Sequence, residues 1–153
     1  MNIIWRPSPN FDARPQGLAV DTIVVHATVF DTLEETCRHF EKPESRVAAH
    51  YTIDRDGTTV QHVEEANRGF HAGVSRMADG REKANDFSIG IELVNRNTGD
   101  DPYPLAQLES LRALITAIRS RHPITFVVSH AEIALPPGRK TDPAGLDVAF
   151  LAD

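Results

Sequence analysis

The sequence has one cysteine, no long apolar run and no excess of positive charge, and each shortage excludes a class of protein. Cys37 is the single cysteine among 153 residues, so an internal disulfide framework is excluded. No apolar run approaches the roughly 18 residues that a membrane-spanning helix requires. A formal net charge of −6 provides no broad positive surface for nucleic acid or for anionic membranes. We therefore expect a protein that binds no nucleic acid and does not span a membrane.

The length and composition predict one domain over residues 1–153. Hydrophobic residues make up 41% of the chain and charged residues 25%, which is enough apolar material for a core without disulfide staples. The first nine residues contain no long apolar segment, so they are not typical of a secretory signal. We expect a monomer that stays in the cytoplasm or is released by lysis.

The hydrophobic pattern predicts strands and helices after an irregular N-terminal arm over residues 1–18. A capping box from Thr32 to Glu35 indicates a short helix that ends near residue 41. Pro104 suits the start of a second helix, in which one apolar face forms a core stripe: Leu105, Leu108, Leu111, Ile115 and Ile118. Apolar, β-branched runs predict strands at 21–26, 49–54, 58–63, 88–94 and 124–129.

The order of these elements predicts an α/β fold with a single mixed β-sheet flanked by helices. Residues 55–57 have the composition of a hairpin turn. Residues 64–86 are expected to form a long loop, and residues 131–145 a second loop rich in proline and glycine. Functional sites in such sheets gather at the ends of strands. Candidate site residues are therefore sought there first.

Two histidines stand at predicted strand ends, and a carboxylate follows the second. His26 ends the run 21–26, His130 directly follows the last strand, and Asp142 comes twelve positions later. Two imidazoles and one carboxylate form a ligand set for one Zn²⁺ ion, with the fourth position open for water as in catalytic zinc sites. Either histidine alone is more often a half-buried residue whose ring is satisfied by the protein. The combination with Asp142 favours metal-assisted hydrolysis.

Hydrolysis at such a centre also requires a base and a positive group near the developing oxyanion. Glu92 lies within an apolar strand, where a carboxylate that faces a cleft would be partly desolvated and have a raised pKa. The local pattern fits an edge-strand glutamate facing water equally well. Lys140 lies two residues before Asp142 and could reach a substrate carbonyl, although a solvated loop lysine is the more ordinary interpretation.

Five segments, in the same order along residues 21–143, resemble motifs of the zinc-dependent N-acetylmuramoyl-L-alanine amidases, the amidase-2 family. They are the strand of the first ligand, a hairpin, a histidine-containing loop, a glutamate-containing strand and the last-ligand segment: Ile23–Thr28, Ala49–Gly57, Gly69–Gly73, Ser88–Glu92 and His130–Pro143. This family shares its fold with the peptidoglycan recognition proteins and phage T7 lysozyme. The resemblance implies that fold, and hydrolysis of the amide between N-acetylmuramic acid and L-alanine in peptidoglycan or muropeptides.

The resemblance also implies roles for individual residues. The zinc ligands would be His26, His130 and Asp142. Glu92 would be the base, and Lys140 would polarise the carbonyl or hold the oxyanion. For His71 the resemblance implies a place in the substrate groove, with a purely structural role as the alternative. Among the other histidines, His50 is expected to support the site or the fold, and the rest are expected at the surface: His39, His62 and His122.

Two departures from the family pattern bear on the biological role. The loop before Asp142 is longer than usual, with Leu135 and Pro136 as an insertion, and Ala27 stands where cytosolic recycling amidases have an Asn-Ile-Ser run. The missing run favours a bacteriolytic amidase of broad specificity, whereas the acidic charge argues against an endolysin attracted to anionic walls. Recycling, phage lysis and wall remodelling therefore stay open as roles.

A non-catalytic peptidoglycan-binding module is the alternative from another class of protein. Such modules keep the groove but lose a ligand, whereas this chain keeps all three ligands together with Glu92 and Lys140. An unrelated zincin metallopeptidase is disfavoured because the sequence has no His-Glu-x-x-His motif.

Overall fold

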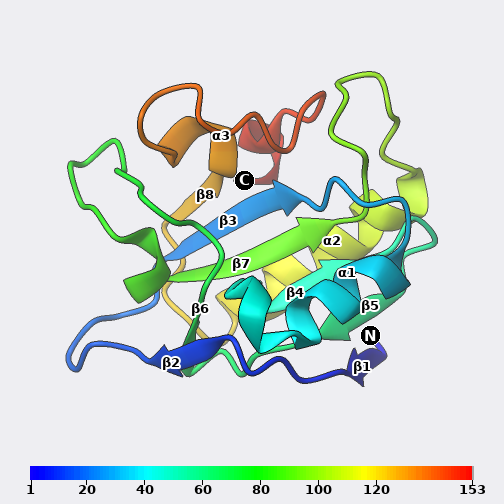
Figure 1. Ribbon diagram of the computed structural model, residues 1–153. Helices are drawn as coiled ribbons and strands as arrows, with labels where there is room; N and C mark the ends of the chain where they lie inside the picture. Colours follow the sequence, from blue (N-terminus) through cyan, green and yellow to red (C-terminus); the bar gives the residue numbers. More distant parts are fainter. Residues whose placement is uncertain (153) are drawn as a thin grey trace.

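A mixed sheet of six strands forms the centre of the computed structural model, which describes residues 1–152 (Figure 1). The strand order is β1-β5-β4-β7-β3-β8. These strands are β1 (Ile3–Trp5), β3 (Thr22–Ala27), β4 (Tyr51–Ile53), β5 (Thr59–Gln61), β7 (Ser88–Leu93) and β8 (Phe126–Ser129). The neighbours β4, β7, β3 and β8 run parallel, and β5 is antiparallel to β4. The α/β fold with a mixed sheet, predicted from the sequence, is confirmed.

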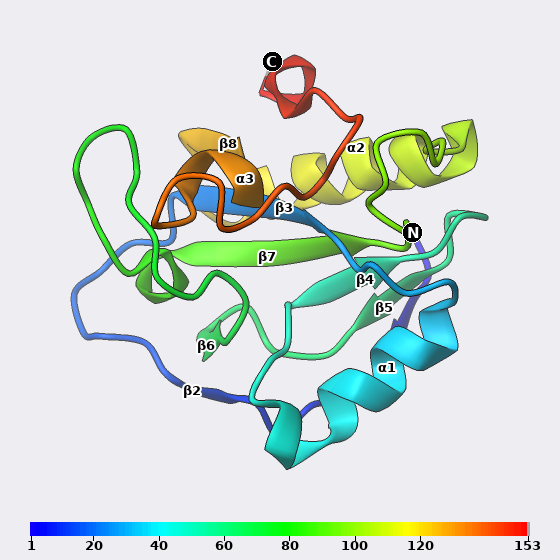
Figure 2. The same ribbon diagram turned by 45° about the horizontal axis from the view of Figure 1, so that its top comes forward.

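Two main helices cover opposite faces of this sheet (Figure 2). The first is α1 (Leu33–Glu41), which begins with the predicted capping box: the Glu35 backbone N–H donates to the Thr32 hydroxyl over 3.2 Å. The second is α2 (Leu105–Arg119), whose buried face packs on the central strands. The short helix α3 (His130–Ile133) follows β8 directly, and 3₁₀ turns lie at Pro43–Ser45, Ala84–Asp86 and Val148–Leu151.

Alternation along the central strands separates an apolar face from a face that carries polar groups. The residues packed with α2 are Ile23, Val25, Tyr51, Ile53, Ile89, Ile91 and Leu93. The opposite face of β3 and β7 presents Val24, His26, Ser88, Gly90 and Glu92, with the segment 72–87 and α3 packed over part of it. The polar residues of the central strands therefore share one face, and His26 and Glu92 lie towards its carboxyl edge.

Four sequence-based expectations need correction. The arm over residues 1–18 is not wholly irregular, because it contains β1 and β2 (Phe11–Ala13), and β2 pairs with β6 (Asn67–Gly69) inside the expected long loop. The expected loop 131–145 starts within α3. Leu105 is 72% exposed and does not belong to the core stripe, because it occupies the first residue of α2, beyond the sheet. Strands of three residues are too short to carry a period in the sequence, so pairing with distant segments defines them.

The structure bears out a finer expectation about the chain. The hairpin predicted around residues 55–57 joins the antiparallel strands β4 and β5. None of the helices within residues 1–152 combines the length and the apolar character needed to cross a membrane.

Candidate metal centre

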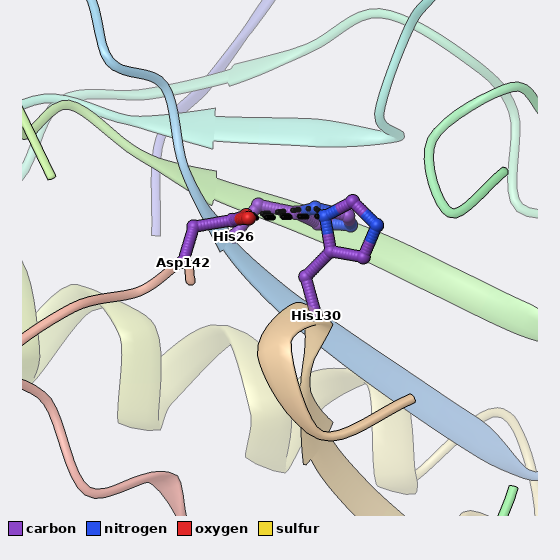
Figure 3. A group of neighbouring side chains, drawn as sticks. All are labelled: His26, His130 and Asp142. Atoms are coloured by element: carbon purple, nitrogen blue, oxygen red, sulfur yellow. Dashed lines mark hydrogen bonds and ion pairs between the residues drawn. The ribbon is translucent and has the colours of Figure 1, made fainter. Parts of the chain in front are cut away.

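Three elements bring the predicted ligands together at one edge of the sheet (Figure 3). His26 lies near the carboxyl end of β3, and His130 is the first residue of α3, directly after β8. Since β3 and β8 pair in parallel with Val25 opposite Ser129, the next residue of each strand emerges at the same edge. Asp142 arrives from the loop after α3, and the backbone N–H of Ala131 donates to its carbonyl over 2.9 Å.

The donor atoms of these residues converge on one point. His26 Nδ1 lies 3.0 Å from His130 Nδ1, and the Asp142 Oδ2 atom lies 3.2 Å from His130 Nδ1 and 3.3 Å from His26 Nδ1. Ligand atoms at about 2 Å from a tetrahedral ion lie about 3.3 Å from one another. The three side chains are buried. Their donor set and spacing fit one metal ion.

The charge states of these groups suit metal binding. Burial lowers the pKa of His26 to about 4, so at neutral pH its imidazole is uncharged and can offer a lone pair. Burial alone would raise the pKa of Asp142, but the His130 and His26 rings beside it hold it below its ordinary value. The centre therefore combines neutral imidazole nitrogen with an anionic oxygen.

Glu92 lies beside this centre because β7 pairs in parallel with β3 and Glu92 stands opposite His26. Its side chain is buried, and its Oε2 atom has no hydrogen-bond partner among residues 1–152. Burial raises the pKa of Glu92 well above its ordinary value, and the nearby Asp142 charge adds to this. The edge-strand alternative is therefore excluded, since β7 is central and its glutamate faces a cleft.

A cleft of about 520 Å³ opens over the centre. Its floor includes His26, Glu92, His130 and Asp142. One wall comes from α1 and its flanking loops, with Phe30, Thr36, His39, Phe40 and Val47. Lys140 is exposed on the opposite rim, where its ammonium group is accessible to a molecule in the cleft. The cleft thus joins the candidate ligands, a proton-accepting carboxylate and a cation.

His71 is buried behind the centre, and both of its ring nitrogens have protein partners. Its Nδ1 atom lies 2.9 Å from His26 Nε2, and its Nε2 atom lies 3.1 Å from the Ser88 hydroxyl. The ring forms part of the cleft lining, yet no ring nitrogen is left for a ligand. Its role in substrate binding stays a prediction, and these contacts favour the alternative, structural role.

The remaining histidines are placed differently from one another. The expectation that His62 lies at the surface is wrong: it is 1% exposed, and its ring bridges the Thr52 hydroxyl at 2.8 Å and the Arg6 carbonyl at 3.0 Å. His39 is half-buried in the cleft wall, and His122 is half-buried against Glu65. His50 is buried, and its Nδ1 accepts the Gly90 N–H over 3.1 Å, which agrees with the expected supporting role.

The sequence analysis did not single out Asn97, which supports the loop that carries Asp142. Its side-chain amide donates to the Thr141 hydroxyl over 3.0 Å, and its carbonyl oxygen accepts the Ala144 N–H over 2.6 Å. Asn97 thereby fixes the chain on both sides of the candidate ligand. The signal available in the sequence is weak: an asparagine in a polar turn, a type that tolerates the positive φ of 63° found here.

Comparison with known proteins adds to this picture. A family model described as N-acetylmuramoyl-L-alanine amidase (Amidase_2) matches residues 16–145. The 1,6-anhydro-N-acetylmuramyl-L-alanine amidase AmpD of Enterobacter cloacae is 38% identical over 156 aligned positions, which cover 90% of this chain and 81% of that protein.

Two solved structures have a similar architecture. A crystal structure of a selenomethionine derivative of AmpD superposes with a TM-score of 0.79 at 34% identity, covering 97% of this chain and 92% of that one. The amidase AmiD from E. coli, in complex with the substrate anhydro-N-acetylmuramic acid-L-Ala-D-γ-Glu-L-Lys, superposes with a TM-score of 0.76 at 29% identity. That match covers 91% of this chain and 59% of the AmiD chain.

Proposed function

The chain belongs to the N-acetylmuramoyl-L-alanine amidase family, and from this premise we propose that its centre holds one zinc ion and hydrolyses the amide between N-acetylmuramic acid and L-alanine. One observation carries the proposal: two imidazole Nδ1 atoms and a carboxylate converge within 3.3 Å of one another, beside a buried glutamate on the adjacent strand. Together they provide a metal site and a base in one cleft.

The residues that would hold the zinc ion are His26, His130 and Asp142. Nitrogen and carboxylate ligands from three side chains match catalytic zinc sites, which leave a fourth position open, and not structural sites, which are closed by four protein ligands. When bound, zinc supplies Lewis acidity that activates a water molecule and polarises the amide carbonyl. The anionic Asp142 and the neutral His26 imidazole are ready to bind without first losing a proton to solvent.

Glu92 is the proposed base. Glu92 lines the cleft, and its buried Oε2 atom accepts no hydrogen bond within residues 1–152, so no donor competes with the proton of the attacking water for this carboxylate. Its raised pKa means that its proton affinity is closer to that of the water from which it takes a proton and of the amine that later receives it. As the tetrahedral intermediate collapses, Glu92 passes the proton to the departing L-alanine nitrogen. The carboxylate is then restored for the next turnover.

Lys140 is the proposed partner of the developing negative charge. It lies on the cleft rim, two residues from Asp142, and Asn97 holds the same loop. An ammonium group at this position can donate to the carbonyl oxygen as that oxygen becomes negative. The wall of Phe30 and Val47 on the other side of the cleft supplies apolar surface against which the remainder of the substrate can pack.

We propose soluble muropeptides that carry the 1,6-anhydro sugar as the preferred substrate. The name of the AmpD relative specifies that sugar, and the solved AmiD complex contains it. These relatives shift the balance away from the bacteriolytic role that the sequence alone favoured. Two solved endolysin structures are similar at 20% and 25% identity, and this level of similarity supports a common fold but does not indicate a common substrate.

The test is a digest by zinc-loaded and by chelator-treated protein. Anhydro-muropeptide and intact peptidoglycan are offered separately, and products are identified by mass spectrometry. We expect free stem peptides with zinc only, and faster release from the soluble substrate. A protein that leaves both substrates intact but sediments with peptidoglycan would instead be a binding module. Faster release from intact peptidoglycan would support the lytic role.

A substitution tests the metal site itself. Asp142→Ala removes the anionic ligand and leaves only two protein ligands, His26 and His130, so zinc content measured by atomic absorption should fall sharply together with activity. Undiminished zinc stoichiometry in that variant would show that Asp142 is not a ligand. Asp147→Ala, an exposed carboxylate on the same C-terminal stretch, serves as the matched control and should keep its zinc.

A further inference from the structure

Two consecutive residues contact the outer nitrogens of both candidate histidine ligands. His26 Nε2 lies 2.9 Å from His71 Nδ1, and His130 Nε2 lies 2.9 Å from the carbonyl oxygen of Ala72. We propose that the His71 side chain and the Ala72 carbonyl are positioning groups that fix the orientation and the tautomer of both ligands. The inference rests on the proposed metal centre, and it assigns His71 to the support of that centre and not to substrate.

The direction of each hydrogen bond follows from the chemistry of the partners. A backbone carbonyl can only accept, so the His130 Nε2 atom must carry the proton that it donates to Ala72. A neutral imidazole has one proton, so His130 Nδ1 keeps its lone pair. That lone pair points at the position shared by His26 Nδ1 and Asp142. The Ala72 carbonyl therefore selects the tautomer that can bind a metal.

The same logic extends through a longer chain of bonds at His26. Its Nδ1 atom faces the centre, so the proton belongs on Nε2, which donates to His71 Nδ1. His71 must then carry its own proton on Nε2, and that proton is directed at the Ser88 hydroxyl, 3.1 Å away. The hydroxyl can accept it. With a metal on His26 Nδ1, the donations run from His26 through His71 to Ser88. The reverse direction, with the Ser88 hydroxyl donating, would place the His26 proton on Nδ1 and exclude a metal there.

The His71 ring is held rigidly enough to serve this purpose. It sits directly on Gly90 of β7, where an added Cβ atom would lie only 2.6 Å from the ring. A glycine at this place in the strand is explained by that close approach, since any side chain would expel the ring. The ring is also packed edge-on against His50, with ring centroids 5.7 Å apart. These contacts, together with the bond to His26, hold the His71 ring in one orientation.

Asn85 anchors the backbone of the pair. Its side-chain oxygen accepts the N–H of His71 over 3.2 Å and the N–H of Ala72 over 2.9 Å. The guanidinium of Arg139 also donates to the Ala72 carbonyl over 3.2 Å, which leaves that carbonyl well fixed. Outer groups of this kind typically contribute a factor of about 10 to 100 in metal affinity.

A matched pair of substitutions at His71 separates positioning from packing. In His71→Asn the side-chain oxygen can occupy the place of Nδ1 and accept from His26, whereas His71→Gln reaches towards Ser88 and leaves His26 without its acceptor. Zinc affinity is measured by competition with a chromophoric chelator. We expect wild type and His71→Asn to agree within a few-fold, and His71→Gln to bind zinc about 10- to 100-fold more weakly. Equal affinities in the two variants would overturn the inference.

A second pair tests the Ala72 branch, whose carbonyl cannot be replaced directly. Asn85→Asp keeps an oxygen for both N–H groups, and Asn85→Leu removes it. We expect weaker zinc binding in Asn85→Leu than in Asn85→Asp. Equal zinc affinities in this pair would overturn the role given to Ala72.

A spectroscopic measurement on the unaltered protein keeps the inference testable even if a variant fails to fold. Long-range ¹H–¹⁵N correlation spectra of the zinc-loaded protein should show slowly exchanging Nε2 protons on both His26 and His130. A His71 ring protonated on Nδ1 would overturn the inference alone. A wild-type protein that binds no zinc at all would overturn the proposed function, and the inference with it.

Discussion

Two glutamates, the half-buried Glu65 and the buried Glu92, show how the same side chain can have opposite protonation properties. Glu65 accepts hydrogen bonds from the Tyr51 hydroxyl at 2.6 Å and the Arg121 guanidinium at 2.7 Å, and it lies 2.7 Å from the His122 ring. Although burial raises its pKa, these partners lower it to about 2. Glu92 is buried without such partners, and its pKa rises.

The difference teaches that burial alone does not decide the state of a carboxylate. Burial disfavours the charged form in both cases, and hydrogen-bond donors reverse that effect only around Glu65. A carboxylate whose oxygens accept several hydrogen bonds links segments of the chain, and these donors stabilise its ionised form against protonation. A carboxylate with an unpartnered oxygen keeps the proton affinity that a base requires.

The substitution with the largest expected effect on this comparison is at Glu92. Glu92→Gln keeps the shape of the side chain but cannot accept a proton, so turnover should fall by about 10³-fold, within the range typical of general acid–base catalysis. Zinc content and thermal stability should not fall, because the replaced carboxylate has no donor to lose. Kinetics with anhydro-muropeptide and a metal assay check both points. Near-wild-type turnover would remove Glu92 from the base role.

At Glu65 the opposite result is expected. Glu65→Gln removes the charge that accepts hydrogen bonds from Tyr51 and from the exposed Arg121, and the free energy of unfolding should fall by about 2 kcal/mol, as for other hydrogen bonds to charged groups. Urea denaturation at neutral pH measures this loss. Turnover per folded molecule should stay close to wild type, since Glu65 does not line the cleft. A large loss of turnover with unchanged stability would contradict the assignment.

Lys140 sharpens the comparison, because it is the cation that faces Glu92 across the cleft. Lys140→Met should lower kcat/KM by about 10²-fold, the effect of losing one donor to an oxyanion. Lys140→Arg keeps the positive charge and serves as the matched control, with a smaller loss. A Lys140→Met enzyme as active as Lys140→Arg would show that this cation does not hold the oxyanion.

The smallest effect is a dependence of stability on pH that belongs to Glu65. Because its folded pKa of about 2 lies below the ordinary value of 4.5, its contribution is present above pH 4.5 and is lost as the pH falls towards 2. At pH 3.5 about one pKa unit of this linkage, about 1.4 kcal/mol, should be lost. Urea denaturation of wild type and Glu65→Gln should therefore give curves that move closer together on acidification. A constant difference in stability would contradict the linkage.

Much of the metal site was predictable because its signals are local. The strand before His26 is a β-branched run, the capping box at Thr32 is contained in four residues, and Asp142 follows His130 closely in the chain. Parallel neighbours end at the same edge of a sheet, so ligands at strand ends were expected to meet. The structure brings His26, His130 and Asp142 together as the sequence predicted, although their catalytic roles stay predictions.

The rest could not be predicted because it depends on contacts between distant segments. Strand β6 exists only through its pairing with β2, more than fifty residues earlier in the chain. His62 is buried because the N-terminal strand lies over it, and the Arg6 carbonyl accepts from its ring. The partners of Glu65 come from β4 and from the end of α2. No pattern within a single segment of the sequence predicts that Glu65 and these partners form a cluster.

The ladder between β3 and β7 has a consequence for how this protein can change. Since His26 and Glu92 are paired on adjacent strands, the distance between the base and this ligand is set by the strand spacing, about 4.8 Å. The rim segment around Leu135 and Pro136 can therefore vary in length while His26 and Glu92 stay in place. Transplanting the segment 134–138 from a relative, with Arg139 kept, should alter which substrates are accepted and leave the reaction itself intact. The reaction and the choice of substrate can thus change independently of each other in this fold.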